Sequence, residues 1–487
     1  MADGDGASDD RIIPLSEEPK NGEWLIKIMK GKNPQSRPKP RIQRVDITLR
    51  EIKSNETCFD PLVVSFGPYH HGKPRLMPME NHKEVAARWF VSLANNNLSA
   101  DAITESNARA TYDQFVVEAT KESSPRDCYA DKFEFKDFMR MMFLDGCFIL
   151  HFMHLVVKCS DELSKSSHLN QPLILRDMFL LENQVPYSIL KALMSLMPDK
   201  SMESNVENFI DMVFLLQHET PQSRSECLTN AISFLTEMFS SLTKKKESTV
   251  GGSNSADRGK DNMPFHLLDF LQSKLIGNSA NSSSSGSGYW SYYFRSIIEL
   301  KAAGIKIGRS NSKYLKDIQF RSGIFNGHLQ LPQFMVDDAT KTRLLNLIAY
   351  EMCPDGLSDR AVTSYICFLD SLIDHAEDVK ELRSKNILLN RLGSDEEVAN
   401  LFNELANNLT PNCNTYSDVM KNIQKHSGSH VKVWIAEFMH THFTSPWTVL
   451  ALMAAIFVIA LTVVQTVYSV VVVMYLPLYS IRTCQEC

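Results

Sequence analysis

The longest hydrophobic segment of the sequence lies near the C-terminus, at residues 447–475, and no charged side chain interrupts it. About 20 apolar residues in a helix cover the hydrocarbon core of a bilayer, and a helix satisfies its own backbone hydrogen bonds there. A buried core helix is a poorer interpretation, because helices of globular proteins are rarely apolar on every side. The pattern therefore predicts one transmembrane helix at 447–475, followed by a short tail at 480–487.

Upstream of this segment, from about residue 46 to 440, apolar residues recur mostly three and four positions apart. This period is typical of amphipathic helices and predicts a large, mainly α-helical body. The pattern changes near 305–336, where short apolar runs flank Asn326-Gly327, a pair typical of hairpin turns. We therefore expect a small β-meander there. The pattern predicts helices at residues 79–90, 138–157, 173–196, 205–242, 340–352, 362–382, 396–405 and 417–425, and strand-like structure at 62–64.

Two of the apolar segments contain polar residues. Residues 138–157 are almost long enough to span a bilayer, but charged residues such as Arg140 and Asp145 interrupt them. Since each charge inside a membrane is costly, we expect a buried helix there rather than a second span. The triplet Glu182-Asn183-Gln184 lies between apolar residues and must find hydrogen-bond partners if it is buried. We interpret it as a packing and hydrogen-bonding node between helices.

Three other segments differ from the helical body in composition. Residues 1–45 form a predicted mobile arm, which is basic and contains no acidic residue from Trp24 to Val45. It is either a solvated linker or a patch for anionic lipid. Residues 244–262 and 278–290 are rich in Gly, Ser and other polar residues, so we predict flexible loops.

Charge, cysteine content and the start of the chain narrow the class of protein. A net charge of −6 over 487 residues argues against general nucleic-acid binding. Ten scattered cysteines favour free thiols in a reducing compartment. The first ten residues, MADGDGASDD, have no apolar signal-peptide region. We therefore expect a single-pass protein, in the plasma membrane, whose body stays in the cytosol because the insertion signal is synthesised last.

The sequence offers few candidates for metal or catalytic chemistry. His70, His71 and His82 match no common zinc spacing, and we predict structural histidines and no metal. The sequence lacks a G-x-S-x-G elbow, an H-E-x-x-H motif and a complete phosphate-binding loop. We therefore predict neither a cofactor nor enzymatic activity. An uncharacterised membrane-tethered hydrolase or transferase is the alternative.

Several sequence blocks resemble those of the plant DUF247 family, also called UPF0481, in the expected order from about residue 45 to 480. The blocks are VSFGPYHHG at 64–72, ME-x-HK at 79–83, MMFLDGCFIL at 141–150, DMFLLENQVPY at 177–187, HLLD at 266–269, EL-x-x-AGI at 299–305 and NLIAYE at 346–351. From them we single out, as structural or interaction residues, Gly67, Pro68, Tyr69, His70, His71, Asp145, Gly146, Glu182, Asn183, Gln184 and Pro186.

The resemblance implies a membrane-anchored plant protein, and some grass members of the family are implicated as pollen-side determinants of self-incompatibility. Together with the lack of catalytic motifs, it favours a recognition or signalling protein. The expected partners are membrane lipid and another protein, and the oligomeric state is left open.

Overall fold

The computed structural model describes residues 42–96, 98, 103–158, 170–198, 201–215, 263–277, 296–323, 326–354, 359–428 and 446–483. The predicted loops at 244–262 and 278–290 lie outside these residues, as do nearly all of the arm at 1–45 and the second half of the tail at 480–487.

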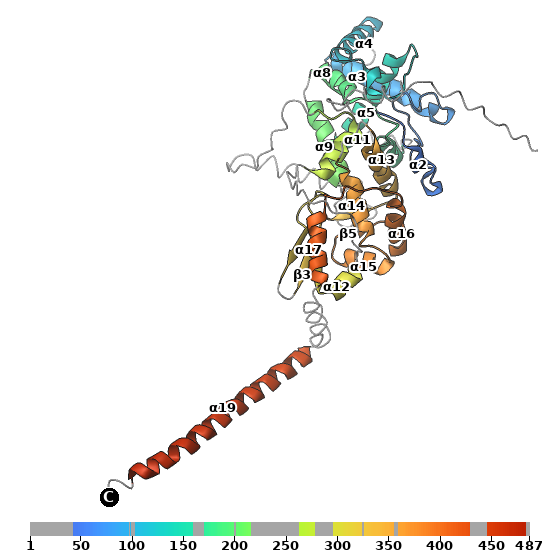
Figure 1. Ribbon diagram of the computed structural model, residues 1–487. Coiled ribbons are helices and arrows are strands. Elements are labelled where there is room, and N and C mark those ends of the chain that lie inside the picture. The colour runs from blue at the N-terminus through green and yellow to red at the C-terminus, as the bar shows by residue number, and fades with distance from the viewer. Residues whose placement is uncertain are drawn as a thin grey trace, which may run out of the picture. The chain divides into compact units, whose positions relative to one another are not determined.

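The described chain is mainly helical, as predicted (Figure 1). Its α-helices are α2 (Ile47–Arg50), α3 (Glu80–Ala94), α4 (Glu105–Ala119), α5 (Phe138–Lys158), α7 (Gln171–Asp177), α8 (Tyr187–Ser195), α9 (Ser201–Leu215), α11 (Leu267–Ile276), α12 (Ile297–Ala302), α13 (Thr340–Met352), α14 (Ala361–Asp370), α15 (Ala376–Ser384), α16 (Asp395–Leu405), α17 (Ser417–Ser427) and α19 (Pro446–Thr483). Short 3-10 turns occur at Lys53–Asn55, Pro74–Met79 and Pro125–Cys128.

Helix α5 is the centre of the N-terminal half of the body. It packs against α3, α8 and α9, and 67% of its Phe138–Val157 segment is buried. This burial confirms the prediction of a core helix rather than a second span. Gly146 lies where α5 meets α8, since a Cβ atom there would stand 2.5 Å from Leu193 Cδ1. A larger residue at this position would push the Leu193 side chain aside, so glycine suits the close approach of the two helices.

Two predicted long helices are each split in the structure. The segment 173–196 forms α7 and α8, separated by an irregular link at 178–186. The segment 362–382 forms α14 and α15, because the chain turns at Asp374 and His375. There the Asp378 carboxylate accepts hydrogen bonds from both backbone N–H groups, at 3.2 and 3.1 Å. Such side-chain acceptors start a new helix even where the apolar period continues. By contrast, α13 covers the predicted 340–352.

The small β-structure is not the predicted meander. Its strands are β1 (Ile305–Arg309), β2 (Gln319–Ser322), β3 (Gly327–Leu331), β4 (Phe334–Val336) and β5 (Leu388–Asn390). β2 and β3 form an antiparallel hairpin where Asn326-Gly327 indicated one, with Gly327 as the first residue of β3, paired with Ser322. β1 pairs with β3 in parallel, giving the order β1-β3-β2. β4 pairs in parallel with the distant β5. The meander was wrong because hydrophobic alternation marks a strand but does not choose its partner.

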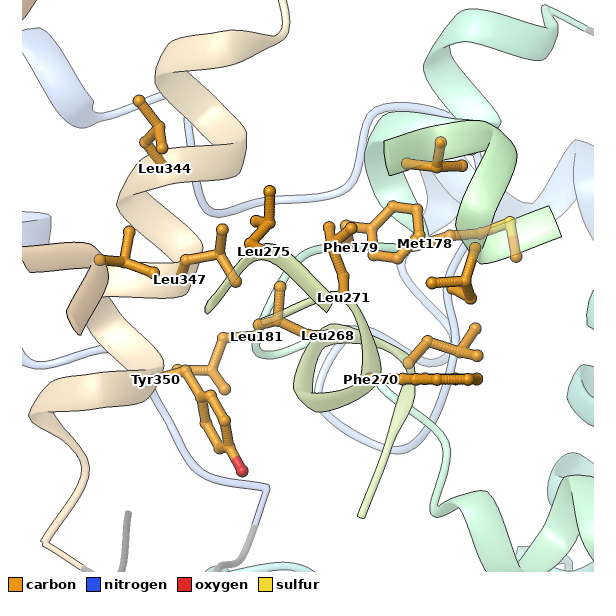
Figure 2. Close-up of a cluster of buried hydrophobic side chains, with 14 of the residues drawn as sticks. Met178, Phe179, Leu181, Leu268, Phe270, Leu271, Leu275, Leu344, Leu347 and Tyr350 are labelled. Carbon is orange, nitrogen blue, oxygen red and sulfur yellow. The ribbon is translucent and has the colours of Figure 1, made fainter. Parts of the chain in front are cut away.

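The hydrophobic core extends from the link at 178–186 to the C-terminal half of the body. Figure 2 shows Phe179 next to Leu271 of α11, and Leu181 near Tyr350 of α13. Leu181, Leu271 and Tyr350 are at most 1% exposed. The apolar side chains of the irregular link thus fix its position in the core. They leave Glu182, Asn183 and Gln184 where they can form hydrogen bonds with other segments.

Helix α19 differs from the body in its exposure. It is one continuous helix of 38 residues (Figure 1), about 57 Å long at 1.5 Å per residue. Its stretch Leu450–Val471 has a mean hydropathy of 2.5 and no buried residue. By length and composition this helix can cross a membrane.

Candidate functional site

The segment at 62–64 is not the predicted strand: Leu62 and Val63 lie in a bend, and a carboxylate holds it. The N–H groups of Leu62, Val63 and Val64 donate to the Asp177 carboxylate, at 2.8–3.1 Å. Arg176 Nη1 lies 2.8 Å from the same side chain, at Oδ1. Burial raises the pKa of Asp177, and the three N–H groups and Arg176 oppose this shift. Three consecutive N–H groups thus converge on Asp177, which fixes the bend in place.

The Asn183 side chain holds the backbone of the next residues, 64–66. Its Oδ1 accepts from the N–H of Phe66 at 2.7 Å, and its Nδ2 donates to the carbonyls of Val64 and Asp177, at 3.1 and 2.9 Å. The amide is 1% exposed and all of these hydrogen bonds are internal. A side chain thus pairs with the backbone of the 64–66 segment as a strand would.

Asp145 of α5 and Lys83 of α3 complete the hold on this segment. Asp145 Oδ2 accepts from the N–H of Gly67 at 2.8 Å, and its Oδ1 lies 2.6 Å from Lys83 Nζ. Lys83 Nζ also lies 2.7 Å from Glu80 Oε1 and donates to the carbonyl of Ser65 at 2.7 Å. Burial alone would lower the pKa of Lys83, but the two carboxylates raise it. Lys83 therefore carries its charge in the core.

Ser65 beside Lys83 resembles a nucleophile and its base, with Oγ 3.5 Å from Nζ. A lysine base must be neutral to take the proton of a serine. The raised pKa of Lys83 keeps the amine protonated, and Ser65 is only 1% exposed. The pair therefore does not activate Ser65, and its contacts are those of a structural ion pair.

Gly67 turns the chain at the centre of this polar junction, which we define as Lys83, Asp145, Asp177, Asn183 and Gln184. Its φ is +66°, a region that residues with a side chain rarely adopt. A Cβ atom there would stand 2.6 Å from the Gln184 carbonyl oxygen and 2.8 Å from the Tyr129 hydroxyl. That hydroxyl donates to the same carbonyl at 3.0 Å. Only glycine fits both the conformation and the space.

Gln184 links the polar junction to the C-terminal half of the body. Its Nε2 donates to the carbonyls of Met178 and Leu180, both at 2.8 Å, and its Oε1 accepts from the N–H of Leu268 at 3.1 Å. The link is also tied to α13, because the N–H of Leu181 donates to Asn346 Oδ1 at 2.8 Å. Segments far apart in the sequence thus share one hydrogen-bonded centre.

Glu182 faces a second group of charges, which we call the ion-pair clasp: Arg50, Asp60, His70, Lys73 and Glu182. Glu182 accepts from the N–H of Val45 at 2.8 Å, and lies 3.0 Å from Arg50 Nη2 and 3.5 Å from His70 Nε2. Lys73 Nζ lies 2.7 Å from His70 Nδ1. Because an ammonium only donates, Nδ1 is the acceptor, and the ring proton of a neutral His70 sits on Nε2, facing Glu182.

Asp60, His70 and Glu182 are the described residues that could hold a metal ion, with one ligand atom of each within 4.8 Å of the others. However, Arg50 lies 3.4 Å from Asp60 as well as 3.0 Å from Glu182, and Lys73 lies against the imidazole. These cations already balance the carboxylates and would repel a divalent ion. The geometry therefore fits a network of ion pairs better than a metal centre.

The clasp predicts a specific acid dependence of stability. Burial would raise the pKa of Glu182, but the hydrogen bonds from His70 and Val45 and the charge of Arg50 lower it to about 2, from 4.5. A carboxylate whose pKa is lower in the folded state stabilises the fold at a pH above its unfolded-state pKa. This stabilisation is lost as the pH falls toward 2. We expect Glu182→Gln to reduce the free energy of unfolding by up to about 3 kcal/mol above pH 5.

This prediction is checked by urea unfolding of the detergent-solubilised full chain between pH 3 and 8, with exposed Glu84→Gln on α3 as the control. The difference between wild type and Glu182→Gln should be constant above pH 5 and shrink below it. A difference that does not change with pH would contradict the ionic role of Glu182.

The remaining residues singled out from the sequence lie around these two groups. Pro68 is buried, and Tyr69 donates to the carbonyl of Ile42 at 3.1 Å. Pro186 is the residue immediately before α8, where its fixed φ suits the entry to a helix. His71 is exposed, and its ring stacks on that of Phe135, with 6.0 Å between the ring centroids. The structure thus gathers most of the predicted set in one buried region and leaves His71 outside it.

Sequence reasoning missed Lys83, Asp177 and Arg50 as members of this region. For Lys83 a signal existed: Ala86, Ala87 and Phe90 follow it by three, four and seven positions and are all buried. A lysine on the apolar face of a helix must have a buried partner. Asp177 carried a comparable signal, since it stands between the apolar runs 173–175 and 178–181 and is buried. Arg50 has polar neighbours in the sequence and carried none.

Most of this chain matches a known protein family. The DUF247 family, described as "Plant protein of unknown function", matches residues 42–461. The UPF0481 protein At3g47200 of Arabidopsis thaliana is 27% identical over 86% of this chain and 84% of its own length. The putative UPF0481 protein At3g02645 of the same plant is 23% identical over 91% and 93%. No solved structure matches significantly. Because the match spans nearly all of the body and part of α19, the chain belongs to the plant DUF247 family.

Proposed function

We propose that the protein is a non-enzymatic recognition protein, anchored by α19 in the plasma membrane with its body in the cytosol. The observation that carries the proposal is the uncharged, mostly apolar stretch Leu450–Val471, in which no residue is buried. Exposing this much apolar surface to water is unfavourable, at roughly 25 cal/mol per Å². A bilayer removes that cost, and one helix anchors a protein without forming a transport path.

The polar junction supports a recognition role over a catalytic one. Its carboxylates and amides accept from backbone N–H groups or oppose a buried ammonium, and Asp145, Asp177 and Asn183 are at most 1% exposed. Catalytic groups need contact with a substrate. We interpret the family blocks as a framework that fixes the body's shape, so that other surfaces meet a partner. A pollen-side role in self-incompatibility is the specific form of recognition that family membership suggests.

Membrane extraction tests the anchor. The full chain should stay in the pellet when membranes are washed with 1 M salt or with carbonate at high pH, because α19 is held by hydrophobic burial and not by charge. A variant that ends before Pro446 should be released by the same washes. A variant whose Leu450–Val471 stretch is replaced by Leu and Ala of equal length should be retained. Release of the intact chain by carbonate would overturn the proposal.

Two further experiments test the cytosolic location of the body and its role in recognition. Protease added outside sealed right-side-out plasma-membrane vesicles should leave the body intact if it faces the cytosol. The extracted chain should then co-purify selectively with a membrane or reproductive-tissue protein. Turnover of ester, glycoside or nucleotide substrates that one carboxylate substitution abolishes would instead favour an enzyme.

A further inference from the structure

Gln465 lies within the Leu450–Val471 stretch of α19, and the anchor does not explain the presence of its polar side chain. Three hydroxyls nearby donate hydrogen bonds to backbone carbonyls of the same helix. Thr462 donates to Val458 O at 2.6 Å, Thr466 to Thr462 O at 2.7 Å and Ser469 to Gln465 O at 2.8 Å. The side-chain amide of Gln465 is exposed and, among the described residues, has no hydrogen-bond partner.

In a bilayer this amide would lie inside the hydrocarbon. It is 15 residues from Leu450 and six from Val471, so roughly 9 Å of apolar helix separate it from the nearer end of the span. The sequence continues apolar beyond that end, from Val472 to Val473 and Met474. An amide without a partner costs several kcal/mol in hydrocarbon, where no water can replace the bond.

The same face of α19 allows another helix to come close. Residues three, four and seven positions apart share one side of a helix. On one flank of Gln465 most of these residues are small, and Leu461 and Tyr468 stand on its other flank. This small face consists of Ala451, Ala454, Ala455, Val458, Thr462, Gln465, Thr466 and Ser469. The opposite face carries the larger Met453, Ile456, Phe457, Val464 and Val467, with one alanine, Ala460, among them. Small residues let the backbones of two membrane helices approach, so that a polar side chain can reach across.

We propose that α19 pairs in parallel with α19 of a second copy of this chain, with the two Gln465 amides hydrogen-bonded to each other. The proposal rests on the membrane anchoring proposed above. A second copy fits because both copies insert in the same direction, which puts the two Gln465 side chains at the same depth. A primary amide has both donor and acceptor groups, so it is its own complement across a two-fold axis.

Energy transfer in vesicles tests the pairing. The full chain carries a donor or an acceptor fluorescent protein at its N-terminus and is reconstituted in phosphatidylcholine vesicles at several lipid-to-protein ratios. Wild type should show transfer above the random-proximity level, falling as lipid dilutes the protein. Gln465→Leu should weaken self-association about 5- to 30-fold, the equivalent of roughly 1–2 kcal/mol for one interhelical hydrogen bond. Gln465→Asn should retain much of the transfer.

Two further variants test the contribution of the small face of α19 separately from that of the Gln465 side chain. Thr462→Leu adds bulk to the small face and should also lower the transfer, whereas Val467→Leu on the opposite face should not. Every preparation is washed with carbonate. Chain that resists the wash but transfers at the random level, or Gln465→Leu that transfers as well as wild type, overturns the pairing and leaves the anchor standing. Wild-type chain released by the wash overturns both.

Discussion

Lys83→Met is expected to lower the free energy of unfolding of the full chain by about 3–5 kcal/mol, because it leaves the buried Asp145 carboxylate without its cation. Asp145 is 1% exposed and Lys83 is fully buried, with 2.6 Å between Oδ1 and Nζ. The carboxylate also holds the N–H of Gly67. Losing the ammonium should therefore loosen the turn at Gly67 as well as α3 against α5.

The measurement is the midpoint of urea unfolding in detergent, followed by near-ultraviolet circular dichroism at pH 7. Lys191→Met on α8 is the matched control, since Lys191 is exposed and its loss should change stability by less than about 0.5 kcal/mol. Adding Asp145→Asn to Lys83→Met should recover part of the loss, because the amide oxygen still accepts from Gly67 without a buried charge. Equal midpoints for Lys83→Met and Lys191→Met would show that the buried pair contributes little.

Gly67→Ala is expected to be the most damaging of the small substitutions, at about 3 kcal/mol or more. Alanine at a φ of +66° costs roughly 1–2 kcal/mol, and its methyl group would also overlap the Gln184 carbonyl and the Tyr129 hydroxyl. One of these groups must move, which breaks the hydrogen bond between them. The backbone strain and the lost hydrogen bond both arise at the turn around Gly67, so both lower the free energy of unfolding.

Gly72→Ala provides the matched control for this prediction. Gly72 has a φ of +78°, and a Cβ atom there would meet nothing within 4 Å. Its substitution should therefore show the conformational cost alone, about 1–2 kcal/mol. The difference between the two variants, read from their thermal unfolding midpoints, measures the crowding at Gly67. If both variants lose the same stability, the close approach to Gln184 has no energetic consequence.

Local patterns predicted the parts of this fold that depend on neighbours in sequence. The helix at 340–352 follows from its apolar period, and a hairpin of β2 and β3 is present where Asn326-Gly327 indicated one, although Gly327 belongs to β3 and not to the turn. The same rules failed for the parallel pairs β1–β3 and β4–β5, whose strands meet across long stretches of chain. They failed again at 178–186, where an apolar period continues but polar side chains bond the backbone out of a helix.

The sequence alone determined the mainly helical body, the apolar length of α19 and the burial of the α5 segment, because each depends on composition and period within one segment. It also marked Glu182, Asn183 and Gln184 as polar residues that require partners. Only the tertiary structure decided what those partners are: Val45 and Arg50 for Glu182, Phe66 for Asn183 and Leu268 for Gln184. These contacts join residues 84 to 137 positions apart, and the free energy that selects them belongs to the assembled core, not to any local pattern.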